Sequence, residues 1–171
     1  MPAMGHTVDN LETGDSPLGR LAMWLATGLG VGLVAPAPGT IGGLWGLALV
    51  EPIARIAPLE AQVAVIGLLV VLAANICTSA VRELGVANDP GAIVLDEIVA
   101  LPIAFLGFST IGWPLLATGF LLFRLFDILK PFGIARLQRL PGGWGVVADD
   151  LAAALAACAT LHVGVWVWMR V

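Results

Sequence analysis

The stretch IVLDEIVALPIAF, residues 93 to 105, places two adjacent carboxylates, Asp96 and Glu97, inside an otherwise unbroken apolar run. An ionised carboxylate in such surroundings costs at least about 2 to 3 kcal/mol, so the pair needs a basic partner, a bound cation or a water-filled cavity. The pair can simply neutralise an arginine or lysine of a neighbouring helix, or it can form a cation site. Pro102 removes the N–H that would bond the Ile98 carbonyl, which predicts a kink one turn beyond the pair.

The composition is that of a membrane protein. The 171 residues are 59% hydrophobic and 12% charged, whereas an average soluble domain has about 45 to 50% apolar and 25% charged residues. Each charge-free stretch approaches or exceeds the roughly 20 residues that a spanning helix needs. These stretches cover residues 21 to 50, 61 to 81, 98 to 123 and 151 to 169. The sequence therefore predicts an all-α, polytopic integral membrane protein with about four to six membrane-embedded helices.

Proline and glycine divide the chain into a polar, disordered tail over residues 1 to 17 and a single helical membrane domain over 18 to 171. The segment from 21 to 34 is short and glycine-rich, and its sequence leaves open whether it crosses the membrane or lies in the interface. The predicted apolar segments are 21 to 34, 41 to 57, 61 to 81, 91 to 107, 113 to 129 and 148 to 169. The predicted interruptions are 35 to 40, 51 to 60, 82 to 91, 107 to 114 and 130 to 145.

Basic residues are unevenly divided between the loops, which predicts the orientation. One side would carry only Arg55 and Arg170, and the positive-inside rule places the other side in the cytoplasm. If the five segments after Pro38 each cross once, the loops at 35 to 40 and 82 to 91 share that side with the 124 to 150 region and could form one site. The basic residues predicted to be cytoplasmic are Arg82, Arg124, Lys130, Arg136 and Arg139.

Several function classes lack support in the sequence. The charge of −4 comes largely from the N-terminal acids, which gives no basic surface for nucleic acid, and no GKS or GKT motif indicates a nucleotide. With only His6 and His162, a zinc site or a histidine phosphatase is poorly supported. Cys77 and Cys158 lie in apolar segments without a CxxC partner and read as small buried side chains.

A second acidic pair, Asp149 and Asp150, follows the glycine-rich turn in GGWGVVADDLAAALAAC, residues 142 to 158. It can complement a helix N-terminus electrostatically, or it can join the first pair around a cation such as Mg²⁺, which favours carboxylate oxygens. In the first motif, Asp89 and Pro90 read as an N-cap and a first helical position. A helix from there would place the first pair roughly 10 Å along its axis.

Two further motifs can bind an anion. In FLLFRLFDILKPFG, residues 120 to 133, Arg124, Asp127 and Lys130 share one helical face. They form either a self-neutralising ladder or a phosphate-binding stripe in which Asp127 orients the basic groups or joins a metal shell. In APAPGTIGG, residues 35 to 43, Gly39 and Thr40 precede a helix, whose N-terminus is suited to phosphate, although a plain helix-starting turn explains the same residues.

Together these motifs resemble the phosphatidylglycerophosphatase A family. The resemblance implies a magnesium-dependent enzyme of the bacterial inner membrane that hydrolyses the terminal phosphomonoester of phosphatidylglycerophosphate at the cytoplasmic face, yielding phosphatidylglycerol and phosphate. The match covers about residues 25 to 155, and its four ordered motifs together are far more specific than any one of them. They are TGLGVGLVAPAPGTIGG (27 to 43), RELGVANDPGAIVLDEIVA (82 to 100), FRLFDILKPFGI (123 to 134) and GGWGVVADDLAAA (142 to 154).

The resemblance also implies roles for individual residues. Asp96, Glu97, Asp149 and Asp150 would coordinate the metal and, with Asp127, act in catalysis, while Asp89 matches a further family acid. Arg124 and Lys130 would hold the phosphate beside Gly39 and Thr40 of the PGT loop. The positions that depart from the family pattern are Gly43, Ala100, Phe132, Gly133, Gln138 and Ala154.

The expected reaction is direct in-line attack of water on the phosphomonoester, with a motif carboxylate as general base. A covalent route through Thr40 or an aspartate is the alternative mechanism. Intramembrane carboxylates also serve small cation or proton-coupled transporters, which is the alternative function, and a noncatalytic scaffold would tolerate Asp96→Asn. The acids outside the tail favour the enzyme because they gather with basic residues on one predicted side, except Glu51 and Glu60.

Overall fold

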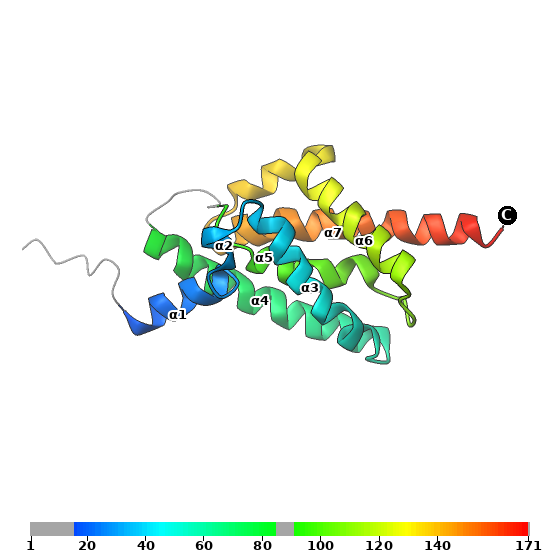
Figure 1. Ribbon diagram of the computed structural model, residues 1–171, viewed down its shortest axis with the longest axis horizontal. Helices are drawn as coiled ribbons and strands as arrows, with labels where there is room; N and C mark the ends of the chain where they lie inside the picture. The colour runs from blue at the N-terminus through cyan, green and yellow to red at the C-terminus, as the bar shows by residue number, and fades with distance from the viewer. Residues whose placement is uncertain (1–15, 85–90, 171) are drawn as a thin grey trace, which may run out of the picture.

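The computed structural model describes residues 16 to 84 and 91 to 170, and in this part of the chain every regular element is a helix (Figure 1). The prediction of an all-α fold is therefore confirmed. The elements are α1 (Pro17–Ala26), α2 (Val31–Val34), α3 (Pro38–Ala54), α4 (Leu59–Leu84), α5 (Leu95–Ala100), the 3₁₀ helix η1 (Leu101–Phe105), α6 (Trp113–Leu129), the 3₁₀ helix η2 (Pro131–Arg139) and α7 (Gly143–Trp168).

Two of the helices are long and apolar enough to cross a membrane, judged by length and composition. These are α4 and α7, of 26 residues each, or about 39 Å. Helices α3 and α6 have 17 residues each, about 26 Å, which is shorter than the roughly 30 Å hydrocarbon layer. The larger number of embedded helices stays a prediction.

The segment predicted at 113 to 129 coincides with α6, whereas the one at 91 to 107 is a broken helix. Helix α5 ends at Ala100 and continues as η1, so the change of helix type falls beside Pro102, where the bend was predicted. The predicted helix start at Asp89 and Pro90 is wrong. Those two residues lie outside the described part, but residues 91 to 94 are not helical and α5 begins only at Leu95.

Two segments that were predicted as nonhelical, the N-terminal tail and the interruption at 130 to 145, are partly helical. Residues 1 to 15 of the predicted tail lie outside the described residues, but Ser16 caps α1 by accepting a 2.9 Å hydrogen bond from the Gly19 N–H, and Pro17 already belongs to the helix. The predicted interruption at 130 to 145 contains η2, and α7 begins at Gly143 rather than at the predicted residue 148.

Helix α7 is the central element of the fold. It packs against α4, α5, α6, η1 and η2, and its first half runs through the middle of the bundle (Figure 1). The side chains it buries there are mostly small, including Ala153, Ala154 and Ala157, which lets neighbouring helices approach closely. The contacts of α7 therefore bring segments far apart in the sequence to the side chains of its first turns.

Candidate active site

The first acidic pair is placed by a tertiary hydrogen bond rather than by a helix cap. The Val94 N–H donates to the Ala26 carbonyl at 2.9 Å, which holds the chain before α5 against the end of α1. Helix α5 therefore starts at Leu95, and Asp96 and Glu97 lie in its first turn instead of roughly 10 Å along a helix. They are 4% and 9% exposed, so both carboxyl groups are held away from solvent.

The second acidic pair enters the site from α7. Helix α7 has no side-chain cap of its own, but its Gly143 N–H donates to the Thr78 hydroxyl of α4 at 2.8 Å. Because α7 begins at Gly143, Asp149 and Asp150 lie about 9 to 10 Å along its axis, beyond the first turn. They are 1% and 3% exposed. Their position therefore does not support the interpretation that they merely complement a helix N-terminus.

Helix α6 supplies the basic groups and a fifth carboxylate. The Arg124 Nη1 lies 2.7 Å from the Asp127 Oδ2 and 3.6 Å from the Glu97 Oε1. The Lys130 Nζ lies 3.7 Å from the Asp127 Oδ1 and forms an ion pair with Asp149. The predicted ladder within α6 thus exists, but its two basic ends also reach carboxylates of α5 and α7, so it joins three helices.

The backbone of Lys130 directs its side chain toward α7. Lys130 ends α6 in the left-handed region, at φ 43° and ψ 51°, a conformation that costs a non-glycine residue about 1 to 2 kcal/mol. Burial of the ammonium lowers the pKa of Lys130, but the hydrogen bond to Asp149 and the neighbouring carboxylates outweigh burial and raise the pKa above its ordinary value. Lys130 is therefore charged at neutral pH.

The predicted phosphate loop meets the same cluster. Gly39 lies in the first turn of α3, and a Cβ atom there would clash with the Glu97 Oε1 and lie 3.1 Å from both terminal nitrogens of Arg124. The N-cap residue of α3, Ala37, makes no side-chain cap, so no capping side chain binds the free N–H groups of this first turn. Thr40 follows in this turn, half-buried, and its hydroxyl makes no hydrogen bond within the described residues.

The carboxylates form two candidate metal-binding groups. Asp96, Glu97 and Asp150 form one, and Asp127, Asp149 and Asp150 form the other; within each group the possible ligand oxygens lie within 4.8 Å of one another. The second group thus contains Asp127, in addition to the four residues that the sequence analysis expects to coordinate the metal. Several buried oxygens have no hydrogen-bond partner among the described residues. They are the Asp96 Oδ1, the Glu97 Oε2, the Asp149 Oδ1 and the Asp150 Oδ2.

These orphaned oxygens decide between the two interpretations of the acidic pairs. If the acids served only to neutralise basic residues, Arg124 and Lys130 would satisfy them, but among the described residues these two pair only with Glu97, Asp127 and Asp149. Four buried carboxylate oxygens remain unpaired, which is costly unless something else binds them. The donor set of oxygens alone is the kind that a hard divalent cation takes. The cluster therefore fits a metal ion better than ion pairing alone.

Sequence reasoning missed Thr78, although its contact positions the whole first part of α7. Its only sequence signal is a hydroxyl within an apolar segment, and an ordinary bond to the backbone one turn earlier explains such a residue equally well. Asp89, the other family acid, lies outside the described residues.

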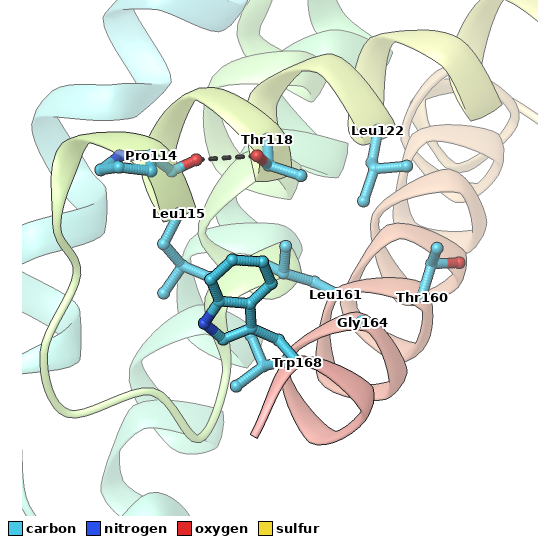
Figure 2. A pocket seen from close by; sticks show the side chains of 9 residues that line it. Pro114, Leu115, Thr118, Leu122, Thr160, Leu161, Gly164 and Trp168 are labelled. Carbon is cyan, nitrogen blue, oxygen red and sulfur yellow. Dashed lines mark hydrogen bonds between the residues drawn. The ribbon is translucent and has the colours of Figure 1, made fainter. Parts of the chain in front are cut away.

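The other end of the α6–α7 pair holds an apolar cavity of about 710 Å³ (Figure 2). Figure 2 shows Pro114 and Leu115 of α6 facing Leu161 and Trp168 of α7, with the Thr118 hydroxyl bonded to the Pro114 carbonyl. In the part of the chain that the structure describes, no charged residue lines this cavity. It is therefore unsuited to bind a phosphate or a metal ion.

Several known proteins are similar in sequence to this chain over most of its length. Phosphatidylglycerophosphatase A of Haemophilus influenzae is 34% identical over 85% of this chain and 92% of its own. The Escherichia coli protein of the same name is 31% identical over 81% of this chain and 80% of its own. A Bacteroides thetaiotaomicron protein provisionally named phosphatidylinositol-3-phosphatase is 33% identical over 86% of this chain and 95% of its own.

No solved structure matches the chain, so the family assignment rests on sequence. The family profile described as phosphatidylglycerophosphatase A matches residues 24 to 165. This range includes α3, α5, α6 and the acidic part of α7, which together supply all the charged groups of the cluster. The chain therefore belongs to the phosphatidylglycerophosphatase A family and is a phosphatase.

Proposed function

We propose that this protein hydrolyses the terminal phosphomonoester of phosphatidylglycerophosphate, with Mg²⁺ as cofactor, at the cytoplasmic face of the bacterial inner membrane. The observation that carries the proposal is the convergence of five carboxylates and two basic groups from α5, α6 and α7 beside the first turn of α3. The family supplies the reaction class and the substrate.

The metal would be held by Asp96, Glu97, Asp149 and Asp150, with Asp127 beside them. Their unpaired oxygens and the absence of nitrogen or sulfur ligands from the two groups favour Mg²⁺ over a softer metal. When bound, Mg²⁺ would offset the charge of the phosphate and polarise its oxygens. The protein itself contributes a frame, because α5 and α6, which carry three of the carboxylates, both pack against α7.

Arg124 and Lys130 would hold the phosphate. A phosphomonoester carries nearly two negative charges, which repel an attacking water and increase on the leaving oxygen. Arg124 and Lys130 both pair with Asp127, and the first turn of α3 approaches the terminal nitrogens of Arg124 at Gly39. Basic side chains and a helix N-terminus together form a suitable anion site.

One of the cluster carboxylates would accept the proton of the attacking water. We propose direct in-line transfer to water. Trapping a labelled phosphoenzyme through Thr40 or an aspartate would contradict this mechanism.

The position of the cluster suits a lipid substrate. Asp149 and Asp150 lie about 9 to 10 Å from the start of a helix about 39 Å long, at a depth where a headgroup meets the hydrocarbon layer. Leu68, Leu121 and Val163 are more than 60% exposed on α4, α6 and α7, as expected where acyl chains cover a protein. The substrate could keep its acyl chains in the bilayer while its phosphate reaches Arg124.

The family and the basic groups favour this function over a cation or proton-coupled transporter. A transporter needs carboxylates at successive depths along a pathway. Here the five carboxylates form two groups that share Asp150, and Arg124 and Lys130 contact three of them.

The test measures phosphate release by the purified protein from phosphatidylglycerophosphate in detergent micelles, with Mg²⁺ and with a chelator. We expect activity only with Mg²⁺, and a loss of at least about 100-fold in Asp96→Asn and in Asp150→Asn. Glu60→Gln is the matched control because Glu60 is an exposed acid in the first turn of α4. Full activity in chelator, or in both cluster variants, would refute the proposal.

The same assay with phosphatidylinositol-3-phosphate tests the second candidate substrate, which the name of the Bacteroides relative suggests. A higher kcat/KM for that lipid would assign the inositol phosphate instead of the glycerol phosphate.

A further inference from the structure

The charge of the cluster is not balanced by its basic groups. Asp96, Glu97, Asp127, Asp149 and Asp150 bring five carboxylates together, whereas Arg124 and Lys130 are the basic groups that contact them among the described residues. If all are ionised, three negative charges remain. One divalent cation would leave the site negative, and a negative site repels a phosphomonoester. Two divalent cations would leave it with one positive charge, which attracts the substrate.

From the division of the carboxylates into two groups, we propose that the site binds two divalent cations that share Asp150 as a bridging ligand. This inference rests on the metal site of the proposed function. Asp96 and Glu97 would hold the first cation, Asp127 and Asp149 the second, and Asp150 belongs to both groups. Pairs of metal ions about 3.5 to 4 Å apart that share ligands are well suited to phosphoryl transfer.

The geometry argues against a single ion that uses every carboxylate. Mg²⁺ binds its ligands at about 2.0 to 2.1 Å, so two oxygens on one ion lie at most about 4.2 Å apart. Oxygens within 4.8 Å of one another, as found in each group, reach this spacing with small side-chain shifts. Within the described part of the chain, Asp96 and Glu97 form no common group with Asp127 and Asp149.

The orphaned oxygens supply an independent observation for both positions. The first group has the Asp96 Oδ1 and the Glu97 Oε2, the second has the Asp149 Oδ1, and Asp150 contributes its Oδ2. Asp96, Asp149 and Asp150 are each more than nine-tenths buried. Each group therefore contains a buried carboxylate oxygen that the protein leaves without a partner.

The two candidate cation positions differ in how closely basic residues already pair with their carboxylates. In the second group, Asp149 pairs with Lys130, and Asp127 lies 2.7 Å from Arg124. In the first, Glu97 is the only carboxylate with a basic neighbour among the described residues, Arg124 at 3.6 Å. A cation in the second group must compete with Lys130 for Asp149. We therefore expect the first site to bind more tightly, with Lys130 released toward the substrate when the second fills.

The experiment counts bound ions directly, with Mn²⁺ as the probe and its paramagnetic resonance signal as the readout, on the full-length protein in detergent without substrate. The wild type and Glu60→Gln should each bind two Mn²⁺ per chain in two steps. Asp96→Asn should lose the tight step and Asp127→Asn the weak one. Asp150→Asn should weaken both at least about tenfold, because it removes a charged ligand of each ion. Circular dichroism and gel filtration check that the variants remain folded.

Other outcomes separate this inference from the proposed function. Lys130→Met should keep two ions and tighten the weak step, which tests the competition without removing a ligand. One Mn²⁺ per wild-type chain, or an Asp150→Asn variant that loses only one step, would overturn the shared-ligand arrangement. An active enzyme that binds one ion would contradict this inference alone. Two bound ions without phosphate release would contradict the proposed function alone.

Discussion

Gly39→Ala would add one methyl group at the point where α3 meets the charged cluster. The new Cβ would lie 3.1 Å from both terminal nitrogens of Arg124 and far inside van der Waals contact with the Glu97 Oε1. Glu97 would have to move by about 1 Å or more, since a carbon and an oxygen normally stay more than about 3 Å apart. That movement would disturb its 3.6 Å contact with Arg124 and its place in the first metal group.

The expected loss follows from the cost of misplaced catalytic groups. A displacement of about 1 Å can reduce the rate about 100-fold, equivalent to about 2.7 kcal/mol of transition-state stabilisation. The stability of the fold should change little, because alanine in a helix gains up to about 1 kcal/mol over glycine and offsets part of the clash. Activity and stability should therefore separate in this variant.

The assay is kcat/KM for phosphate release from phosphatidylglycerophosphate, together with the thermal unfolding midpoint. Gly67→Ala is the matched control, because Gly67 also lies in a helix but a Cβ there meets nothing within 4 Å. The control should keep full activity. Wild-type kcat/KM in Gly39→Ala would refute the placement of Glu97 and Arg124 against α3.

Two further predictions concern the contacts that hold α7. Lys130→Met should lower the unfolding midpoint of the metal-free protein because it leaves Asp149 buried without its partner. Since the pKa of Lys130 is raised in the folded protein, its contribution to stability is complete below the ordinary pKa of 10.5 and disappears as the pH rises through the higher folded value. Wild-type and variant midpoints that do not converge at high pH would contradict this prediction. Thr78→Val removes the acceptor of the Gly143 N–H and should lower the free energy of unfolding by about 1 to 2 kcal/mol, or the unfolding midpoint by roughly 2 to 8 °C. The control Thr118→Val loses only an exposed hydroxyl bonded within its own helix, so its free energy of unfolding should stay within about 0.5 kcal/mol of the wild type. Equal midpoints for the two variants would argue against the Thr78 cap.

The acidic residues of the candidate site can be picked out from the sequence because the cost of burying them is local. A carboxylate in a long apolar run needs an explanation wherever the helices lie, so Asp96 and Asp150 stand out without any tertiary information. The bounds of α6 are also local, since Trp113 and Pro114 open the helix and Pro131 prevents its continuation. These features depend only on neighbours in the chain.

The sequence does not predict where α5 and α7 begin, because both starts depend on distant residues. A hydrogen bond from the Val94 N–H to Ala26 delays the start of α5, so a plausible cap at Asp89 gave the wrong helix bounds. The Thr78 hydroxyl allows α7 to start five residues before the predicted position, at Gly143. In both cases a tertiary partner outweighs the local capping preference.

The glycines of α3 show how an unremarkable local pattern sets the geometry of the cluster. In the sequence, Gly39 and Gly42 read as parts of a turn before a helix, but in the structure they lie inside α3 with Gly46 on one helical face. A Cβ at Gly42 would lie 2.5 Å from the Val94 Cβ, and one at Gly46 would lie 2.9 Å from the Ile98 carbonyl oxygen. The face of α3 without side chains therefore determines how closely α5 approaches it, and with that the depth at which Glu97 meets Arg124.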